Sequence, residues 1–554
     1  MFAKIINIIF VENLKGEKMK SNLLKIVLSS VLLSIAWLGG NGLTLFVALV
    51  PLLLVSGSYD GSARSFWKMF GWTTLCWTLW YVFTVWGVWI AAPVGVPAAL
   101  FFGLLYTATP VMLYHFVSKR VPRSLAYVVL VAGFIVGEHI YNTSQTSFPW
   151  LNLGNGFAHG FGPMLVQWYE WTGVYGGTLW VLLVNILLFE AITRGRGERR
   201  GALIGALVAF VLPIVVSLTL YYTYTPSERT MAVTVVQPNI DPYTEKFSTS
   251  QQQQTANLIE LACRAPQGTE LIVMPETAID ESLVEGEDMG SASTELLRKV
   301  LTAKYPDADI VAGAMTYRFY PGEAKPSPTA RRRGGPWYDV YNSALSIDTT
   351  ANIDISHKSK LVIGVEMMPD WLILRPLYDM IVDLGGTTGQ LGRDSERVVF
   401  SAAGAKYATA ICYESIYGAH FAEYVRGGAE LMTVITNDGW WGTSPIHRQH
   451  FDFSRLRAIE TRRAIARSAN TGISAIISPR GEELHSLGWD KRGVISADVP
   501  VDTRQTIYTQ YGDLVVRICR YLLVLSALYY IAYRTRRKDL LVDEPQTNSP
   551  KRKK

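Results

Sequence analysis

Ile272-Val273-Met274-Pro275-Glu276-Thr277 ends a short apolar run with a carboxylate, and comparable runs recur through the middle of the chain. They alternate there with longer stretches whose apolar residues have helical spacing. This alternation predicts a layered α/β sheet between residues 230 and 510. Buried strands are expected at 231–237, 271–274, 309–314, 343–347, 407–411, 431–436 and 472–477, and helices near 250–264, 291–304 and 446–468.

Three places in this region carry side chains with potential chemistry. Glu276 follows an apolar run, Lys358 lies in a largely apolar stretch, and Cys412 follows another run before an expected helix start. Singly, each has a simpler interpretation as a solvated glutamate, a surface lysine and a small core cysteine. Because open α/β sheets gather catalytic groups at strand ends, the three together form a sensible set of base, cation and thiol nucleophile.

Other classes of site lack their sequence signatures. The chain has 4 cysteines without a C-x-x-C or Cys/His pattern, so no metal site is expected. It has neither G-x-G-x-x-G nor G-x-x-x-x-G-K-[ST], which argues against dinucleotide and P-loop binding. The net charge of +6 comes largely from basic clusters beside apolar segments, a pattern of membrane topology and not of nucleic-acid binding.

The region before residue 230 reads as a membrane domain. Residues 26–59 and 69–118 contain no Asp, Glu, Lys or Arg. A spanning helix needs about 20 apolar residues, and the breaker at 92–97 divides the longer run into two spans. Seven spans are expected at 22–38, 43–57, 68–91, 97–117, 124–142, 171–190 and 201–222, with an eighth at 514–533.

The loops between the expected spans alternate in charge. One set is rich in Lys and Arg, whereas the loops near 39–42, 92–97 and 143–168 have none. The positive-inside rule therefore puts residues 1–21 and the basic tail 534–554 in the cytoplasm, and the 230–510 domain on the outer side. Met19 is a possible true start of the chain, and the first apolar run is interpreted as a retained helix and not a signal peptide.

Several motifs, taken in order, resemble one family of membrane enzymes. The chain resembles the apolipoprotein N-acyltransferases, a membrane-embedded branch of the nitrilase superfamily, whose catalytic triad is Glu, Lys and Cys. Seven spans, a nitrilase domain and one further span is that family's layout. The motifs that carry the resemblance are Val236-Gln237-Pro238-Asn239-Ile240, Met274-Pro275-Glu276-Thr277, His357-Lys358-Ser359-Lys360-Leu361-Val362, Cys412-Tyr413-Glu414, Thr436-Asn437-Asp438 and Phe148-Pro149-Trp150.

The resemblance implies a fold and a set of site residues. The expected fold is a bundle of eight transmembrane helices (residues 22–222 and 514–533) with an extracytoplasmic α-β-β-α sandwich at 230–510. Glu276, Lys358 and Cys412 correspond to the triad. Supporting or substrate-binding roles are expected for Glu366, Glu414, Tyr413, Asn437, Trp440, Trp441, Phe247, Phe148 and Trp150.

The chain also departs from the family's pattern. Val362-Ile363-Gly364-Val365 precedes Glu366 where the family usually has Pro and Gly. Glu138 resembles a family position, but Tyr141 stands where an Arg is often found and Ser147 replaces a common Gly. These departures concern lipid and headgroup binding and leave the triad intact.

The activity implied by the resemblance is the last step of lipoprotein maturation. A phospholipid would donate an acyl chain to Cys412, and the resulting thioester would acylate the α-amine of a diacylglyceryl-prolipoprotein, without a cofactor. The expected location is the bacterial inner membrane, with the catalytic domain in the periplasm. A membrane-anchored nitrilase or amidase is the first alternative, and a non-catalytic membrane scaffold is the second; eight spans exceed what an anchor needs.

Overall fold

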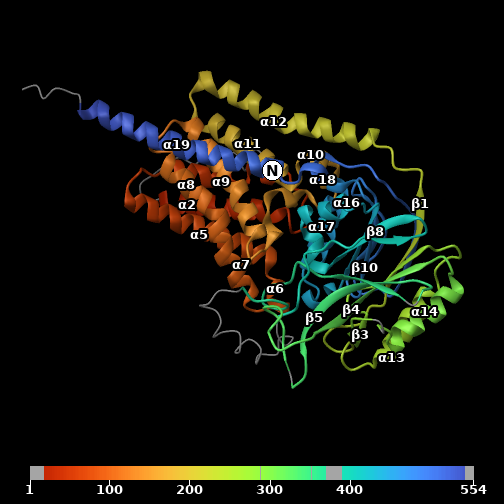
Figure 1. Cartoon of the computed structure of the whole chain (residues 1–554). Coiled ribbons are helices and arrows are strands. Elements are labelled where there is room, and N and C mark those ends of the chain that lie inside the picture. The colour runs from red at the N-terminus through yellow and green to blue at the C-terminus, as the bar shows by residue number, and fades with distance from the viewer. Residues whose placement is uncertain (1–17, 287–288, 333, 351, 370–389, 543–554) are drawn as a thin grey trace, which may run out of the picture.

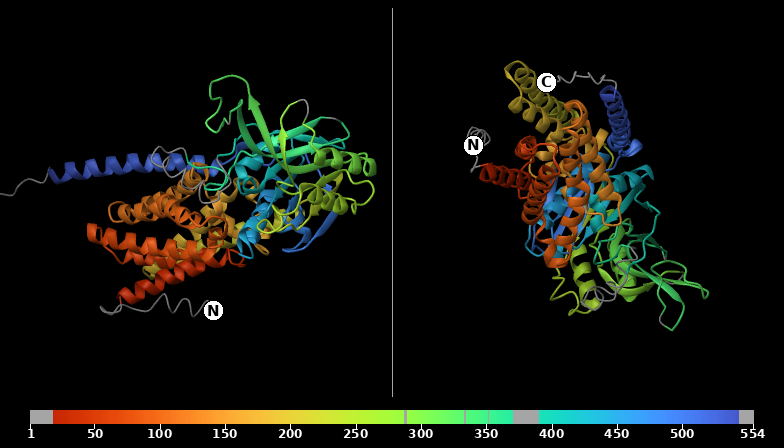
Figure 2. Two further views of the ribbon diagram at one scale, coloured as in Figure 1. Left: turned by 90° about the horizontal axis from the view of Figure 1, so that it is seen from below. Right: turned by 90° about the vertical axis from the view of Figure 1, so that its left-hand side faces the viewer.

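The chain folds into a helical part and an α/β part that lie end to end (Figure 1). The computed structural model describes residues 18–286, 289–332, 334–350, 352–369 and 390–542. Of the expected cytoplasmic segments, residues 1–17 and 543–554 lie outside the described residues. Figure 2 shows the same division from two further sides.

Five described helical segments are long and apolar enough to cross a membrane. They are Gly95–Val117, Arg123–Thr143 (α9), Val174–Thr193 (α11), Arg196–Thr223 (α12) and Leu514–Thr535, the last within α19 (Leu514–Val542). The first is continuous through α7 (Gly95–Gly103), the π-helical turn η1 (Leu104–Ala108) and α8 (Thr109–Val117). All five coincide with predicted spans.

The three remaining predicted spans are also helical, but they are shorter or less apolar. They correspond to α2 (Lys18–Ile35), to α3 (Leu45–Ala48) with α4 (Val50–Gly57), and to α5 (Ala63–Val85). Leu45–Gly57 is a shorter apolar helix. α5 has 23 residues but is rich in Trp, Tyr and Thr, which lowers its hydropathy. The total of eight spans stays a prediction.

The α/β part contains two sheets packed face to face. One has the order β13-β1-β2-β4-β5-β6, with β3 beside β4, and the other has the order β12-β11-β10-β9-β8-β7. The first sheet comprises β1 (Thr230–Gln237), β2 (Leu271–Val273), β3 (Ile279–Val284), β4 (Asp309–Tyr320), β5 (Trp337–Ile347), β6 (Ile353–His357) and β13 (Gly493–Pro500). The second comprises β7 (Phe400–Ala402), β8 (Ala405–Ile411), β9 (Leu431–Thr436), β10 (Ile465–Ala469), β11 (Ser474–Ile477) and β12 (Glu483–Leu487).

Helices cover the outer face of each sheet and complete the expected α-β-β-α sandwich. Alternate residues of one strand serve the two layers, as the pleat requires. Leu271 and Val273 pack between the sheets, whereas Ile272 packs under α13 (Gln251–Ala262) and α14 (Ala292–Lys304). The second sheet is covered by α16 (Gly418–Arg426) and α17 (Ile446–Thr461), which lie between it and the helical part (Figure 1).

All seven predicted strands are present, but the helix predicted near 446–468 is too long. α17 ends at Thr461, and Arg462 adopts a left-handed conformation with φ of 50°. Residues Ile465–Ala469 then form β10, which pairs in parallel with β9. The Arg-rich pattern of the helix continues into the strand, so the sequence does not mark where one element ends and the next begins. Arg467, in β10, is fully buried and pairs with Asp438.

The segment between α9 and α11 joins the two parts. It forms the 3-10 turns η2 (Pro149–Leu151), η3 (Leu153–Phe157) and η4 (Gly162–Leu165), followed by α10 (Tyr169–Thr172). Most of its residues are buried, and its partners include α17 of the α/β part. This aromatic segment, whose part up to residue 168 has no Asp, Glu, Lys or Arg, therefore forms the surface of the helical part against which the α/β part packs.

Candidate active site

Glu276, Lys358 and Cys412 each follow the end of a strand. Glu276 comes after β2, Lys358 directly follows β6, and Cys412 begins the 3-10 turn η6 (Cys412–Ile416) directly after β8. Their exposed fractions are 7, 1 and 7% respectively. Two strands belong to one sheet and the third to the other, so the site lies between the sheets at one edge of the sandwich.

The Lys358 ammonium bridges two carboxylates. Its Nζ lies 3.0 Å from Glu276 Oε1 and 2.9 Å from Glu366 Oε1. Burial alone would lower the pKa of Lys358, but the two carboxylates outweigh it and hold that pKa well above its usual range. The lysine is therefore a fixed cation at neutral pH, able to stabilise a developing oxyanion.

Asn342 on β5 serves both carboxylates as well, and sequence reasoning missed it. Its side-chain Nδ2 donates to Glu276 Oε1 at 2.8 Å and to Glu366 Oε1 at 3.0 Å. Its backbone carbonyl accepts the backbone N–H of Lys358 at 2.8 Å. The only signal in the sequence is a polar residue inside an otherwise strand-like run. Asn437 contributes through its backbone, since its N–H donates to Glu276 Oε2 at 3.2 Å.

Cys412 is held in a strained backbone conformation, with φ of 50°. Burial raises the pKa of its thiol, as does the neighbouring Glu276, while Lys358 acts in the opposite direction without reversing the shift. The resting group is thus a neutral thiol, which needs a base before it can attack.

Glu414 joins the cysteine turn to the lysine loop. Its Oε2 accepts the N–H of Ile411 at 2.9 Å, and its Oε1 accepts the N–H groups of Ser359 at 2.7 Å and Lys360 at 3.2 Å. Burial alone would raise the pKa of Glu414, but His420 and these N–H donors lower it to about 2. The carboxylate is therefore a structural clamp and stays ionised.

A second buried cluster lies behind the nucleophile, and sequence reasoning did not single it out. His450 on α17 lies 3.1 Å through Nε2 from the Cys412 carbonyl and 2.9 Å through Nδ1 from Asp438 Oδ1. Arg467 donates to Asp438 Oδ2 at 2.8 Å. The cluster ties the strained cysteine to α17 and β10.

The segment between α9 and α11, called the membrane segment from here on, reaches this cluster through aromatic side chains. Trp150 stacks on His450 with ring centroids 5.9 Å apart and donates from Nε1 to Gln449 Oε1 at 2.6 Å. Phe148 stacks on Trp150 at 5.6 Å, and Trp441 meets Trp150 edge-on at 5.8 Å. Phe148, Trp150 and Trp441 thus form one layer near the site.

The remaining expected residues occupy different positions. The Tyr413 hydroxyl donates to the Ser147 carbonyl at 2.9 Å, linking the residue after the nucleophile to the membrane segment. Trp440 packs on Tyr243 at 5.3 Å, outside that layer. Phe247 is 69% exposed on the surface. The structure therefore brings Trp441 to the site, while Trp440 and Phe247 lie at its periphery.

Glu138, which resembles a family position, and Tyr141 and Ser147, which depart from the family's pattern, have local partners. Glu138 is buried and accepts the N–H of Leu153 at 2.7 Å and the Thr178 hydroxyl at 2.8 Å. The Tyr141 hydroxyl donates to the Ala99 carbonyl at 2.9 Å, and Ser147 Oγ lies 2.6 Å from the Tyr417 hydroxyl. Among the described residues, no cluster of three His, Cys, Asp or Glu side chains could hold a metal ion.

Comparison with known proteins places both parts of the chain. The carbon-nitrogen hydrolase family matches residues 232–508, and the apolipoprotein N-acyltransferase N-terminal domain matches residues 29–187. An amidase of known structure from Nesterenkonia sp. has 16% identity over 53% of this chain and 97% of its own, with a TM-score of 0.34, too low to bear on the assignment.

Relatives named apolipoprotein N-acyltransferase cover most of the chain. The protein from Chlorobaculum tepidum is 29% identical over 86% of this chain and 89% of its own length. Those from Geobacter metallireducens and Rhizobium meliloti are 27% and 30% identical over 93% and 74% of this chain, and over 95% and 72% of their own lengths. With a matching domain in each part and a relative 30% identical over most of both chains, the chain belongs to the apolipoprotein N-acyltransferase family of the carbon-nitrogen hydrolases.

Proposed function

We propose that this acyltransferase moves an acyl chain from a membrane phospholipid through a thioester on Cys412 to the N-terminal amine of a diacylglyceryl-lipoprotein. The observation that carries the proposal is the contact between Tyr413, next to the nucleophile, and Ser147 of the membrane segment. A nucleophile joined to the membrane domain suits a lipid substrate, whereas a soluble amide needs no such contact.

In the first half-reaction, Glu276 takes the proton of the Cys412 thiol. The sulfur attacks the ester carbonyl of the phospholipid, and the oxyanion forms beside the Lys358 ammonium and a backbone N–H after Cys412. The C–O bond then breaks, Glu276 returns the proton to the leaving alkoxide, and lysophospholipid departs. The acyl group remains on sulfur as a thioester.

In the second half-reaction, the α-amine of the lipoprotein attacks the same carbonyl. Glu276 accepts the amine proton, the C–S bond breaks, and the proton returns to the Cys412 sulfur as the amide forms. No ATP is required, since both ester and thioester are already activated. Glu366 and Asn342 hold Lys358 and Glu276 in place, and Glu414 holds the two loops together.

The proposed topology has eight spans, with residues 230–510 in the periplasm and both termini in the cytoplasm. Contacts between basic loops support it. Lys18 donates to the Ser58 carbonyl at 3.2 Å, Arg120 to the Gly61 carbonyl at 3.1 Å, and Arg123 lies 3.5 Å from Glu190. These loops therefore gather at one end of the bundle, while the opposite end meets the α/β part through Val174 and Glu460.

Mass spectrometry of the purified protein incubated with phospholipid tests the chemistry. We expect an acyl-sized, hydroxylamine-sensitive mass on the Cys412 peptide, absent in Cys412→Ala. Glu276→Gln should slow its formation about 10²- to 10⁴-fold, as loss of a general base does. Glu295→Gln, an exposed glutamate of α14, is the matched control. A folded wild type that forms neither adduct nor lysophospholipid contradicts the proposal and favours the amidase alternative.

A further inference from the structure

A second cavity lies at the junction of the two parts, away from the catalytic residues. Its volume is about 200 Å³, and Glu276, Lys358 and Cys412 do not line it. Ser147 contacts both Tyr417, which lines the cavity, and Tyr413, the residue after Cys412. Its walls come from the end of α9, the start of α11, the start of α16 and the connection from α18 (Ile507–Tyr511) to α19. The turns η2 and η3, the loop after β6 with Lys360, and α17 with Arg457 complete them.

Its place in the fold is at the surface of the membrane. α9 ends at Thr143, and α11 and α19 begin at Val174 and Leu514, so three candidate spans terminate around it. Thr143 and Ala419 are exposed at its mouth. Such a position is level with lipid headgroups on either assignment of the two sides.

Several polar atoms that face the cavity have no hydrogen-bond partner among the described residues. They are Oδ1 of Asn142, Oδ1 of Asn155 and Nδ1 of His420. His420 is only 2% exposed. A buried polar group without a partner is unfavourable, so this concentration in one cavity points to a polar occupant.

One side of the cavity favours an anion. Lys360 makes no ion pair within the part of the chain that the structure describes, and its ammonium lies 5.4 Å from the Tyr417 ring centroid. α16 begins there with no side-chain cap at Tyr417, so its first N–H groups face a cavity without an intrahelical acceptor. A phosphate group combines the charge and the acceptor oxygens that these groups lack.

The other side presents acceptors. The amide Nδ2 of Asn142 is occupied by the Tyr175 hydroxyl at 2.7 Å and that of Asn155 by the Pro149 carbonyl at 2.8 Å, which leaves their oxygens free to accept. The carboxylate of Asp513 lies nearby, with the Tyr508 hydroxyl at 3.1 Å and His139 at 3.6 Å. This side suits N–H or O–H donors.

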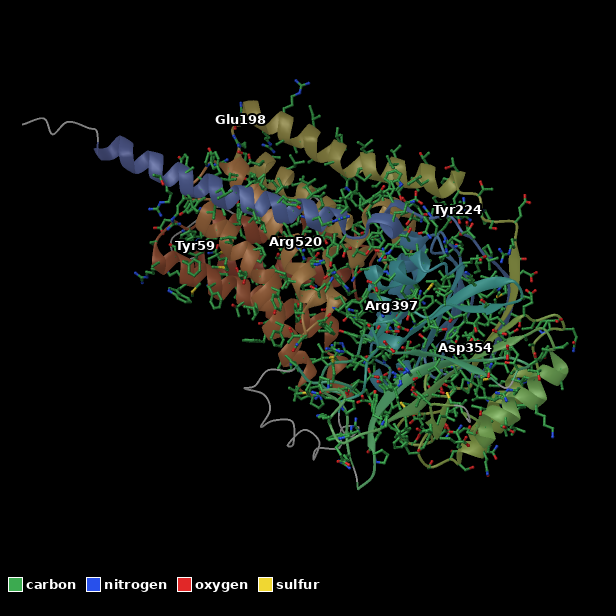
Figure 3. All side chains as sticks on the ribbon, in the orientation of Figure 1. Tyr59, Glu198, Tyr224, Asp354, Arg397 and Arg520 are labelled. Atoms are coloured by element: carbon green, nitrogen blue, oxygen red, sulfur yellow. The ribbon has the colours of Figure 1, made fainter. Side chains whose placement is uncertain are left out.

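The rim charges are otherwise neutralised by protein. Glu423 pairs with Arg397 at 2.8 Å, and Arg457 pairs with Glu460 at 2.8 Å. Figure 3 labels Arg397, the partner of Glu423, in the α/β part, and Arg520 on α19.

We infer that this cavity is a second, non-catalytic lipid site, which binds the headgroup of a phospholipid whose phosphate is followed by a hydrogen-bond donor, as in phosphoethanolamine. The phosphate lies at Lys360 and the start of α16, and the donor end lies at Asn142, Asn155 and Asp513. Because the Lys360 N–H also binds Glu414, an occupied cavity steadies the loop that carries Lys358.

Native mass spectrometry of the full chain in the Cys412→Ala background tests the inference without turnover. Delipidated protein is titrated with matched short-chain phosphatidylethanolamine, phosphatidylcholine and diacylglycerol, and with inorganic phosphate as competitor. We expect one phosphatidylethanolamine to bind at this site. Its affinity should fall about tenfold in Lys360→Gln, because one charge-assisted hydrogen bond is lost. Phosphatidylcholine should bind more weakly and diacylglycerol should not occupy the site.

Two further variants make the result decisive. Ala419→Trp fills the mouth from an exposed position without changing charge and should also remove this lipid, while Lys299→Gln on α14 should not. Equal lipid retention in all the variants overturns the inference, as does inorganic phosphate that competes as strongly as the lipid binds. Since no thioester can form in this background, failure here leaves the catalytic proposal untouched.

Discussion

At the scale of single residues, the site depends on how three charged groups share one buried space. Lys358 is stable as a cation there only because Glu276 and Glu366 lie within 3.0 Å of it. Asn342 donates to both carboxylates from the adjacent strand. Glu276 and Lys358 are therefore positioned as one unit, which in the proposed mechanism activates the neutral thiol of Cys412.

Asn342→Leu preserves volume but removes both donors. We expect acylation of Cys412 to slow by about tenfold or more, and the free energy of unfolding to fall by about 1–3 kcal/mol, because two buried carboxylates each lose a hydrogen bond. Single-turnover acylation and thermal unfolding in detergent measure the two effects. An unchanged acylation rate in folded protein would show that Asn342 does not position the base.

At the scale of elements, the site is assembled where strand ends and loops come close together. β4 passes so near the end of β2 that only glycine fits at position 313, since a Cβ there would lie 2.4 Å from Thr277 N and 2.6 Å from Glu276 Cα. Glu414 fastens the turn after β8 to the loop after β6. Glu414 thereby fixes the turn after β8, in one sheet, relative to the loop after β6, in the other sheet.

Gly313→Ala should displace Glu276 by a few tenths of an ångström or more. We expect a loss of activity on the order of 10²-fold, since small misplacements of catalytic groups have that effect, with the fold retained. Gly488→Ala is the control, because its Cβ would meet nothing within 4 Å. Acylation rates of the two variants give the comparison, and equal rates would show that the space at Gly313 does not govern the base.

The Glu414 clamp should also make stability depend on pH. Its pKa falls from an ordinary 4.5 to about 2 in the folded chain, so its stabilisation of about 3 kcal/mol is complete above the ordinary value and is lost as the pH falls through about 2. Wild type should therefore lose more stability than Glu414→Gln over this acid range. Denaturant unfolding at a series of pH values measures the difference, and parallel curves would contradict it.

At the scale of the whole molecule, the membrane segment between α9 and α11 joins the helical part and the α/β part into one unit. Trp150 stacks on His450, and His450 in turn contacts the Cys412 carbonyl. Support for the nucleophile therefore runs from the helical bundle into the sandwich. This continuity accounts for a catalytic domain that is built against several spans instead of hanging from one.

The proposed orientation predicts which surfaces face outward. In a Cys263→Ser background, Glu323→Cys in the α/β part should react with an impermeant maleimide on intact spheroplasts, because Glu323 is exposed. Gly197→Cys, in the basic first turn of α12, should react only after the membrane is opened. The reverse pattern would invert the topology.

The sequence by itself determined the features that depend on local residue patterns. Charge-free runs, strand-forming runs and three motifs at strand ends were enough to predict the membrane domain, the seven strands and the triad, because hydrophobic periodicity and chain length act over short stretches. The resemblance to a family added the sandwich and the activity. The extent of the helix near 446–468 was wrong, since helical spacing continued into residues that the pairing of β10 with β9 draws into a sheet.

Only the tertiary structure decided which polar residues meet. Asn342 and Glu276 are 66 positions apart, and His450 and Cys412 are 38 positions apart, so no local sequence pattern predicts either contact. The same holds for the cavity at the junction, whose walls come from elements far apart in the sequence. Burial and contact are properties of the packed whole: two carboxylates keep the buried Lys358 a bridging cation, burial keeps Cys412 a thiol, and packing leaves polar atoms at the junction without partners.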